Sequence, residues 1–244
     1  MRLVIEDDYA ALSRTTAAVL LGATLHDRRV NLSVTAGATP VGAYQIVTPL
    51  LAARREALTD VHFYNFDEVP QQGRSLGLTM AALQQDFYGP AQVPQENVHV
   101  LEPGTADAIR ADLRAHGGLD LMLMGLGADA HFCGNMPGVT RFEPDIYTYD
   151  IDPALPWAAG LDQLDPVPTR VVTMGAAMVL RARQAVLIVS GEAKADALAE
   201  VVAGDIGPDR PATVLRMNPD LLLIADRAAT SRLTRAADGA WRRR

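Results

Sequence analysis

The sequence predicts an α/β protein with a mainly parallel, Rossmann-like sheet flanked by helices. Short apolar runs, such as residues 119–124 and 185–189, have the length and composition of strands that are buried on both faces. They alternate with longer segments of helical periodicity, as in successive β-α-β units. Small residues and glycines follow several of these runs directly, which is typical of parallel strands that end at a ligand site.

Each expected element has a local signal. Asp7 or Asp8 can cap a helix that runs to about His26, because a carboxylate accepts the free N–H groups of a first turn. Thr39 and Pro40 likewise suit the start of the next helix. The expected strands are residues 2–6, 30–35, 61–66, 98–101, 119–124, 170–175, 185–189 and 221–226. One expected helix follows Asp8 and another follows Pro40. A third runs from the loop at 70–76 to about residue 88, and the others lie near 105–116, near 175–182 and after the strand at 185–189.

The 244 residues contain no internal repeat, low-complexity linker or convincing boundary. We therefore expect a single domain spanning residues 1–244. Residues 138–168 are rich in proline and lack a regular period, and a long irregular stretch inside a compact domain is typical of a lid or binding segment. The sequence thus predicts one domain with an irregular lid candidate at 138–168.

Composition excludes several classes of protein. The net charge of −7 disfavours nucleic acids and anionic membranes as partners. No apolar run approaches the roughly 18 residues of a membrane span, and the N-terminus turns acidic too early for a signal peptide. Cys133 is the only cysteine, so no intramolecular disulfide is possible. We expect a soluble, cytoplasmic protein whose basic end, residues 241–244, is a disordered tail.

A loop of small residues follows the strand expected at 30–35. In this loop Gly37, Ala38 and Thr39 lead into Pro40, so a strand gives way to the amino end of a helix. That arrangement presents free backbone N–H groups to an anion. The loop lacks the Walker lysine and the glycine spacing of a dinucleotide fingerprint. It predicts a phosphate-binding loop, with an ordinary βα turn as the alternative.

Lys194 is the only lysine among the 22 basic residues. It lies in the expected first turn of the helix after the strand at 185–189. A cation at that position opposes the helix dipole unless an anion shares the site. The compact ammonium of lysine also cannot be replaced by the wide fork of arginine. Lys194 is therefore a candidate phosphate ligand, although chance could also leave one lysine in an arginine-rich chain.

Two groups of acid–base residues follow expected strands. Asp67 and Glu68 come after an aromatic run, and Asp129 and His131 follow the run at 119–124. Ligands bind beyond the carboxyl ends of parallel strands, so these side chains are placed for proton transfer. A capping aspartate at the first place, and a solvated aspartate with a half-buried histidine at the second, are the alternatives. No ligands occur at metal spacing, and we expect no metal or cofactor.

Four segments resemble, in this order, the glucosamine-6-phosphate deaminase / 6-phosphogluconolactonase family. They read Thr-Ala-Gly-Ala-Thr-Pro at 35–40, Asn-Phe-Asp-Glu at 65–68, Gly-Leu-Gly-Ala-Asp-Ala-His at 125–131 and Ser-Gly-Glu-Ala-Lys at 190–194. The resemblance covers nearly the whole chain. It implies a Rossmann-like enzyme of carbohydrate metabolism that acts on a small phosphosugar and needs no metal.

The resemblance also implies roles for the acid–base residues. In the deaminases, the position of Asp67 carries the base that moves a proton between C2 and C1 of an amino sugar phosphate. The position of His131 assists opening of the pyranose ring, and the position of Asp129 supports the site. In the lactonases the histidine instead activates water against the lactone carbonyl. Either chemistry suits a carboxylate and an imidazole near neutral pH.

The same resemblance assigns the phosphate of the substrate. The positions of Gly37, Ala38 and Thr39, together with that of Lys194, hold phosphate in the family. The arginine that grips phosphate from the lid of the deaminases has no clear match in this sequence. Arg170 lies where lactonases tend to carry an arginine, and it is a further candidate phosphate ligand.

Two departures mark a divergent branch. Asn135, Met136 and Pro137 follow the Asn-Glu-Pro of deaminases more closely than the Leu-Phe-Pro of lactonases. Met136 nevertheless replaces the glutamate that pairs with the deaminase histidine, which leaves the orientation and tautomer of the imidazole less controlled. Ala130 replaces a usual glycine. The main expectation is a glucosamine-6-phosphate deaminase-like isomerase. The alternatives are a 6-phosphogluconolactonase-type hydrolase and a non-catalytic phosphosugar-sensing domain, and an oligomer is possible.

Overall fold

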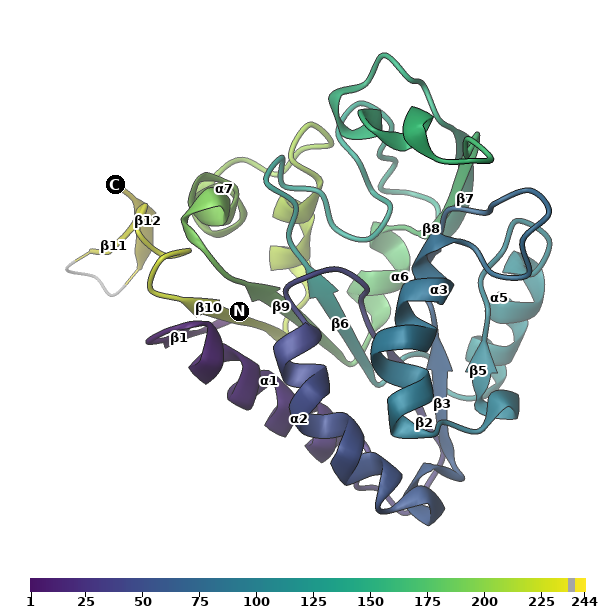
Figure 1. The fold of residues 1–244 in the computed structure, drawn as a ribbon. Coiled ribbons are helices and arrows are strands. Elements are labelled where there is room, and N and C mark those ends of the chain that lie inside the picture. Colours follow the sequence, from purple (N-terminus) through teal and green to yellow (C-terminus); the bar gives the residue numbers. More distant parts are fainter. Residues whose placement is uncertain (237–239) are drawn as a thin grey trace.

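The computed structural model describes residues 1–236 and 240–244, which fold around a central seven-stranded sheet (Figure 1). All neighbouring strands of this main sheet are parallel. From edge to edge they are β1 (Arg2–Glu6), β10 (Leu221–Asp226), β9 (Gln184–Val189), β6 (Leu121–Gly125), β2 (Val30–Ser33), β3 (Val61–Tyr64) and β5 (Val98–His99). The predicted mainly parallel α/β sheet is confirmed.

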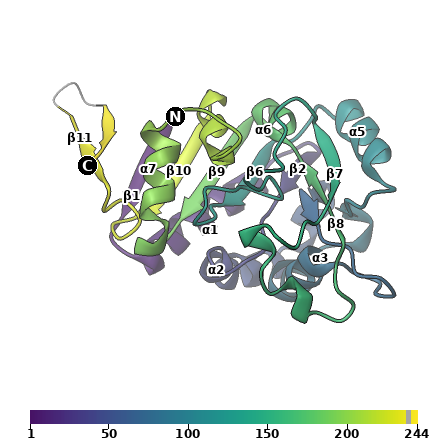
Figure 2. The same ribbon diagram turned by 90° about the horizontal axis from the view of Figure 1, so that it is seen from above.

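Helices cover both faces of the main sheet, as Figure 2 shows for α2 and α3 on one side and α5, α6 and α7 on the other. The first face carries α1 (Tyr9–Ala23), α2 (Val41–Ala52), α3 (Leu78–Leu83), the π-helix η2 (Gln84–Tyr88) and α4 (Gly89–Ala91). The second carries α5 (Ala106–Ala115), α6 (Ala176–Arg181) and α7 (Ala195–Ala203). Short 3-10 turns are η1 (Arg55–Leu58), η3 (Gln95–Asn97), η6 (Glu192–Lys194) and η7 (Pro211–Met217).

The alternation of side chains along each buried strand divides the interior into two cores. Leu121 and Leu123 of β6 pack toward α1 and α2, whereas Met122 and Met124 pack toward α5, α6 and α7. Successive side chains of a strand point to opposite faces, so a strand buried on both faces must be apolar throughout. This explains why the runs lacked the alternation of a half-exposed strand. None of the helices in the described residues has the length and apolarity needed to cross a bilayer.

A small antiparallel sheet lies apart from the main sheet. It consists of β4 (Asp67–Glu68), β8 (Arg170–Met174) and β7 (Ile146–Asp150), in the order β4-β8-β7. The strand expected at 61–66 therefore ends early: β3 stops at Tyr64, and Asp67 and Glu68 form a separate strand. The prediction that residues 138–168 are irregular is wrong at Ile146–Asp150, because these residues form the strand β7. Beyond β7, residues 151–169 form turns and two short 3-10 helices, η4 (Pro156–Ala158) and η5 (Leu161–Gln163).

The basic C-terminus is ordered where the structure describes it. β11 (Leu233–Arg235) and β12 (Trp241–Arg243) form an antiparallel hairpin beside α7 (Figure 2). The guanidinium of Arg243 pairs with Glu200 of α7. The prediction of a disordered tail is wrong because strand pairing and this ion pair hold the end against the domain.

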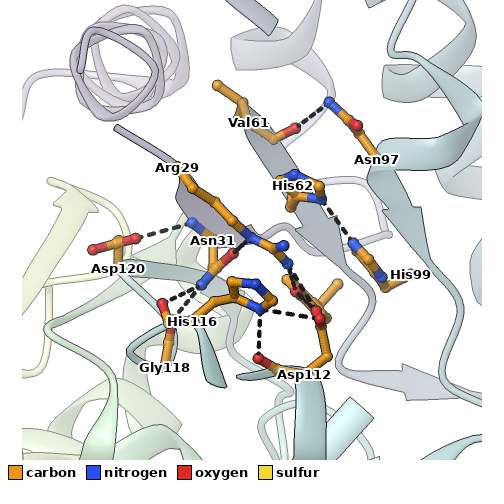
Figure 3. A network of polar contacts seen from close by, with 11 residues as sticks. Arg29, Asn31, Val61, His62, Asn97, His99, Asp112, His116, Gly118 and Asp120 are labelled. Carbon is orange, nitrogen blue, oxygen red and sulfur yellow. Dashed lines mark hydrogen bonds and ion pairs between the residues drawn. The ribbon is translucent and has the colours of Figure 1, made fainter. Parts of the chain in front are cut away.

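A polar network fastens α5 to the β2–β3–β5 side of the main sheet (Figure 3). Nδ1 of His62 lies 2.9 Å from Nε2 of His99, and Arg29 bonds both the Tyr64 hydroxyl at 2.6 Å and Asp112 at 2.8 Å. One ring of the histidine pair must donate and the other accept, so at least one must be neutral. Burial lowers the pKa of both His62 and His99, and the positive charge of Arg29 acts in the same direction.

We expect this histidine pair to weaken the fold as the pH falls. Because the folded state lowers the pKa of His62 and His99, the unfolded chain binds more protons once the pH drops below about 6.5. Stability from the neutral pair is then lost. In urea denaturation at pH 7.5 and pH 5.5, the double variant His62→Gln, His99→Gln should lose less stability between the two pH values than the wild type. Equal losses in both proteins would contradict this expectation.

Candidate active site

A pocket of about 340 Å³ opens at the carboxyl ends of β2 and β6, next to the turn that follows β9. Its wall contains the loop at residues 35–40 and the segment at 125–127, together with side chains from other parts of the chain. Six of the eight residues proposed from sequence lie on this wall: Gly37, Ala38, Thr39, Asp67, His131 and Lys194. Segments far apart in the sequence therefore meet at the edge where a parallel sheet binds its ligands.

Asp67 enters the pocket from β4. Its pKa is raised to about 7 because the side chain is buried and because the Glu68 carboxylate lies next to it, whereas a hydrogen bond with the Thr79 hydroxyl acts in the opposite direction. A group with a pKa near 7 can accept and return a proton at neutral pH. Asp67 thus has the properties of a general base.

Glu68 has a different environment, although it is adjacent. Its side chain is buried, and its carboxylate accepts the backbone N–H groups of Val69, Thr79 and Met80 at 2.8–3.0 Å. A Cβ at Gly77 would lie 2.3 Å from the Glu68 carboxyl carbon, so glycine is needed there. Glu68 therefore caps the start of α3. The sequence left both Asp67 and Glu68 open as candidate bases. In the structure Asp67 borders the pocket, whereas Glu68 holds the start of α3.

His131 and Asp129 form a hydrogen-bonded pair. Nδ1 of His131 lies 2.6 Å from Oδ1 of Asp129, and the same oxygen accepts the backbone N–H of His131 at 3.2 Å. Burial acts to raise the pKa of Asp129, but the hydrogen bonds and charge of His131 outweigh it and hold the pKa below its ordinary value. The carboxylate keeps the proton on Nδ1, which leaves Nε2 as the acceptor. Asp129 lies behind His131 rather than on the pocket wall.

The turn that carries this pair depends on Gly127. Its N–H donates to the His131 carbonyl at 2.9 Å, and its carbonyl accepts the Ala130 N–H at 3.0 Å. A Cβ at position 127 would lie 2.0 Å from Nδ1 of His131 and 2.5 Å from Oδ1 of Asp129. Ala130 has a φ of 64°, in the left-handed region that favours glycine. The chain therefore turns tightly between Gly127 and His131.

Asp67 and the His131 loop are joined through Thr173 of β8. Asp67 lies opposite Thr173 in the small sheet, and the Met174 N–H donates to the Phe66 carbonyl at 2.6 Å. The Thr173 hydroxyl accepts the Gly134 N–H at 3.0 Å. One strand therefore positions both proton-transfer groups.

The loop after β2 offers backbone donors to the same pocket. The N–H groups of Gly37, Ala38 and Thr39 make no hydrogen bond within residues 1–236 and 240–244. Tyr9 of α1 braces this loop, because its hydroxyl accepts the Gly42 N–H at 2.9 Å and donates to the Ala38 carbonyl at 3.3 Å. Free N–H groups beside the start of a helix favour an anion.

Thr39 is not the N-cap that the sequence predicted. α2 begins at Val41 with Pro40 at the cap position, and no side chain bonds its first turn at that position. No described residue accepts from or donates to the Thr39 hydroxyl, which borders the pocket. Because the helix starts one residue later than expected, the Thr39 hydroxyl stays available to a ligand.

Lys194 approaches the pocket from the turn η6, immediately before α7. Among the described residues no carboxylate lies within ion-pairing distance of its ammonium group. A half-buried cation without a counter-ion, close to free N–H groups, is stabilised by an anion. Arg170 does not join it: it is exposed at the start of β8, pairs with Asp150 at 3.1 Å and lies outside the pocket wall. The structure therefore does not bring Arg170, which the sequence proposed as a phosphate ligand, to this pocket.

Residues that sequence reasoning missed complete the wall. Thr79 of α3 contacts Asp67, and Phe66 and Cys133 add apolar surface. Burial, and to a lesser degree the charge of Asp67, raises the pKa of the Cys133 thiol, which stays neutral. Met136 also borders the pocket. No motif marks Thr79, because it reaches the site only through the turn that Glu68 caps.

Comparison with protein families gives one match along most of the chain. The sequence model of a family described as glucosamine-6-phosphate isomerases/6-phosphogluconolactonase matches residues 6–223. A glucosamine-6-phosphate deaminase of Clostridioides difficile is 28% identical over 243 residues, which are 96% of this chain and 97% of that protein. The deaminase of Oceanobacillus iheyensis is 26% identical over 239 residues, or 94% and 95% of the two chains.

Solved structures show the same fold. A monomeric glucosamine-6-phosphate deaminase superposes with a TM-score of 0.82 at 22% identity, covering 95% of this chain and 99% of the other. A 6-phosphogluconolactonase from Trypanosoma cruzi superposes with a TM-score of 0.74 at 17% identity, covering 96% and 97%. At these identities the similarity establishes the architecture only.

Proposed function

Because the chain belongs to the family of glucosamine-6-phosphate isomerases and 6-phosphogluconolactonases, we propose that it is a phosphosugar enzyme of the deaminase type. The observation that carries the proposal is that one pocket is lined by two groups of residues: the free N–H groups with Lys194, and Asp67 with His131. In the proposed complex these two groups mark the two ends of the bound substrate. The curated relatives named as deaminases match over almost their whole length, which favours this activity over the alternatives.

The phosphate of the substrate binds at the first end. The N–H groups of Gly37, Ala38 and Thr39 and the hydroxyl of Thr39 surround its oxygens, and the Lys194 ammonium neutralises its charge. The net charge of the protein, −7, opposes an anion, so these local donors must dominate. A small phosphosugar is thus the expected partner.

The sugar ring and its C1–C2 bond lie at the second end. Asp67 takes the proton from C2 and returns it at C1, which a pKa of about 7 permits. His131, oriented by Asp129, transfers the proton that opens the pyranose ring. For an amino sugar, this shift produces an imine at C2. Addition of water and loss of ammonia then give the ketose phosphate.

A panel of substrates tests the proposal. Release of ammonia and ketose phosphate from glucosamine 6-phosphate supports it. Release of acid from 6-phosphogluconolactone, without ammonia from the amino sugar, identifies a lactonase instead. Met136 leaves His131 with Asp129 as its carboxylate partner, and the family that matches the chain includes 6-phosphogluconolactonases, so this second activity is worth measuring. Binding of phosphosugars without any turnover would indicate a sensing domain.

The proposal extends to the organisation of the chain. Residues 1–244 act as one domain, and residues 138–168 act as a lid over bound substrate. Trp157 of this segment packs edge-on against Tyr149 with ring centroids 6.0 Å apart, and the Tyr149 hydroxyl bonds the Gly134 carbonyl at 2.8 Å. The segment therefore contacts the loop that carries His131. A cytoplasmic location suits an enzyme of sugar phosphates.

We expect the acid limb of the pH–activity profile to follow Asp67. Activity as a base requires the carboxylate, so kcat/KM should fall tenfold per pH unit below a midpoint near the pKa of about 7. The Glu68 carboxylate contributes to that raised value. Glu68→Gln should therefore move the midpoint to lower pH. A midpoint that stays unchanged in this variant would contradict the assignment of the acid limb to Asp67.

A further inference from the structure

The turn that carries Lys194 is held by a carboxylate from the neighbouring strand of the main sheet. Asp226, at the end of β10, is only 4% exposed. Its carboxylate accepts the Ser190 hydroxyl at 2.5 Å and the Gly191 N–H at 3.0 Å, both from the turn after β9. It also accepts the Ala229 N–H at 2.8 Å. All three donors therefore bond to one buried carboxylate, that of Asp226.

These bonds fix the direction in which the chain leaves β9. Gly191 has a φ of 89°, a conformation that other residues rarely adopt, and its carbonyl accepts the Lys194 N–H at 3.1 Å. The path from Asp226 to the lysine backbone therefore consists of two successive hydrogen bonds. Bonds to a buried, charged acceptor are stronger than bonds between neutral groups.

We propose that Asp226 is a positioning residue for the phosphate end of the pocket, acting through the Ser190–Gly191 turn on Lys194. This inference rests on the proposed function, because it requires Lys194 to bind the phosphate of the substrate. Asp226 itself lies outside the pocket wall and touches no substrate. Its effect is on affinity for the phosphate, and the proton-transfer groups on the small sheet are independent of it.

The test compares inorganic phosphate binding in the wild type, Asp226→Asn, Lys194→Met and the double variant. We expect Asp226→Asn to raise the dissociation constant of phosphate about five- to thirtyfold, the range of one or two lost interactions. The KM for glucosamine 6-phosphate should rise in parallel, while kcat stays within about twofold of the wild type. In the Lys194→Met background, Asp226→Asn should cause no further loss.

Two further variants distinguish a positioning role of Asp226 from a general loss of structure. Ser190→Ala removes one donor to Asp226 and should raise the dissociation constant of phosphate less than Asp226→Asn does. Asp120→Asn is the matched control, because Asp120 also accepts a backbone N–H, that of Asn31 at 2.9 Å, but lies at the amino end of β6. It should leave phosphate affinity unchanged.

The outcomes separate the two proposals. If Lys194→Met leaves phosphate binding intact, the proposed phosphate end is wrong, and the role of Asp226 falls with it. If Lys194→Met weakens binding but Asp226→Asn does not, the phosphate end stands and the positioning role is overturned. Full additivity of the two changes, or a fall of kcat without a change in KM, also overturns the positioning role.

Discussion

Replacing Asp67 by asparagine should abolish turnover while making the protein more stable above neutral pH. Loss of a positioned general base lowers kcat by about 10²- to 10⁴-fold. The pKa of Asp67 is raised from 3.8 to about 7 in the folded state, so stability is lost as the pH rises between these two values. Asparagine carries no charge and removes that loss. Steady-state kinetics, and thermal unfolding at pH 5 and pH 8.5, measure both effects.

The neighbouring carboxylate provides the contrast. Glu68→Ala deletes the acceptor of three backbone N–H groups, so we expect the free energy of unfolding to fall by about 1–3 kcal/mol. Glu68→Ala should lose activity only to the extent that its folded structure is lost.

Phosphosugar binding should survive in Asp67→Asn, because this variant leaves the phosphate end of the pocket untouched. An Asp67→Asn protein that turns over normally would refute the proposed base.

Gly127→Ala should have the second largest effect on activity. The new methyl group would overlap the His131 ring and the Asp129 carboxylate, whose nearest atoms lie 2.0 Å and 2.5 Å from an ideal Cβ. The pair must move, and a displacement of about 1 Å at a reacting group costs about 10²-fold in rate. Overpacking also lowers the free energy of unfolding by about 1–3 kcal/mol. Kinetic assays and urea denaturation on the same samples test both effects.

The matched control makes the same chemical change in open space. Gly22 of α1 has no atom within 4 Å of an ideal Cβ. Gly22→Ala should leave kcat/KM unchanged and raise the free energy of unfolding by up to about 1 kcal/mol, the difference in helix propensity. Wild-type kinetics in Gly127→Ala would show that the His131–Asp129 geometry has no role in the reaction.

The sequence predicted the main sheet and most of the pocket because their signals are local. A run such as residues 119–124 must be a buried strand, and a parallel strand delivers the residues after it to one edge. Gly37, His131 and Lys194 each follow such a strand directly. These residues meet in one pocket because the order of the strands brings the ends of their strands together. The alternation of strands and helices along the chain limits which strand orders are possible.

The small sheet could not be predicted, and three of the wrong or undecided assignments involve it. β4 has two residues and no period, and its partner lies about a hundred residues further along the chain. Nothing local distinguishes Asp67 from Glu68, because their difference lies in the turn at Gly77 and the N–H groups of α3. The place of Arg170 outside the pocket wall could not be predicted for the same reason, since its pairing with Asp150 depends on the β7–β8 register.

The junction at Thr173 divides the pocket between two supports. The phosphate donors stand on the main sheet, whereas Thr173 ties Asp67 and the His131 loop to the small sheet. The separation between the phosphate donors and the proton-transfer groups is therefore set by how the small sheet packs against the main sheet.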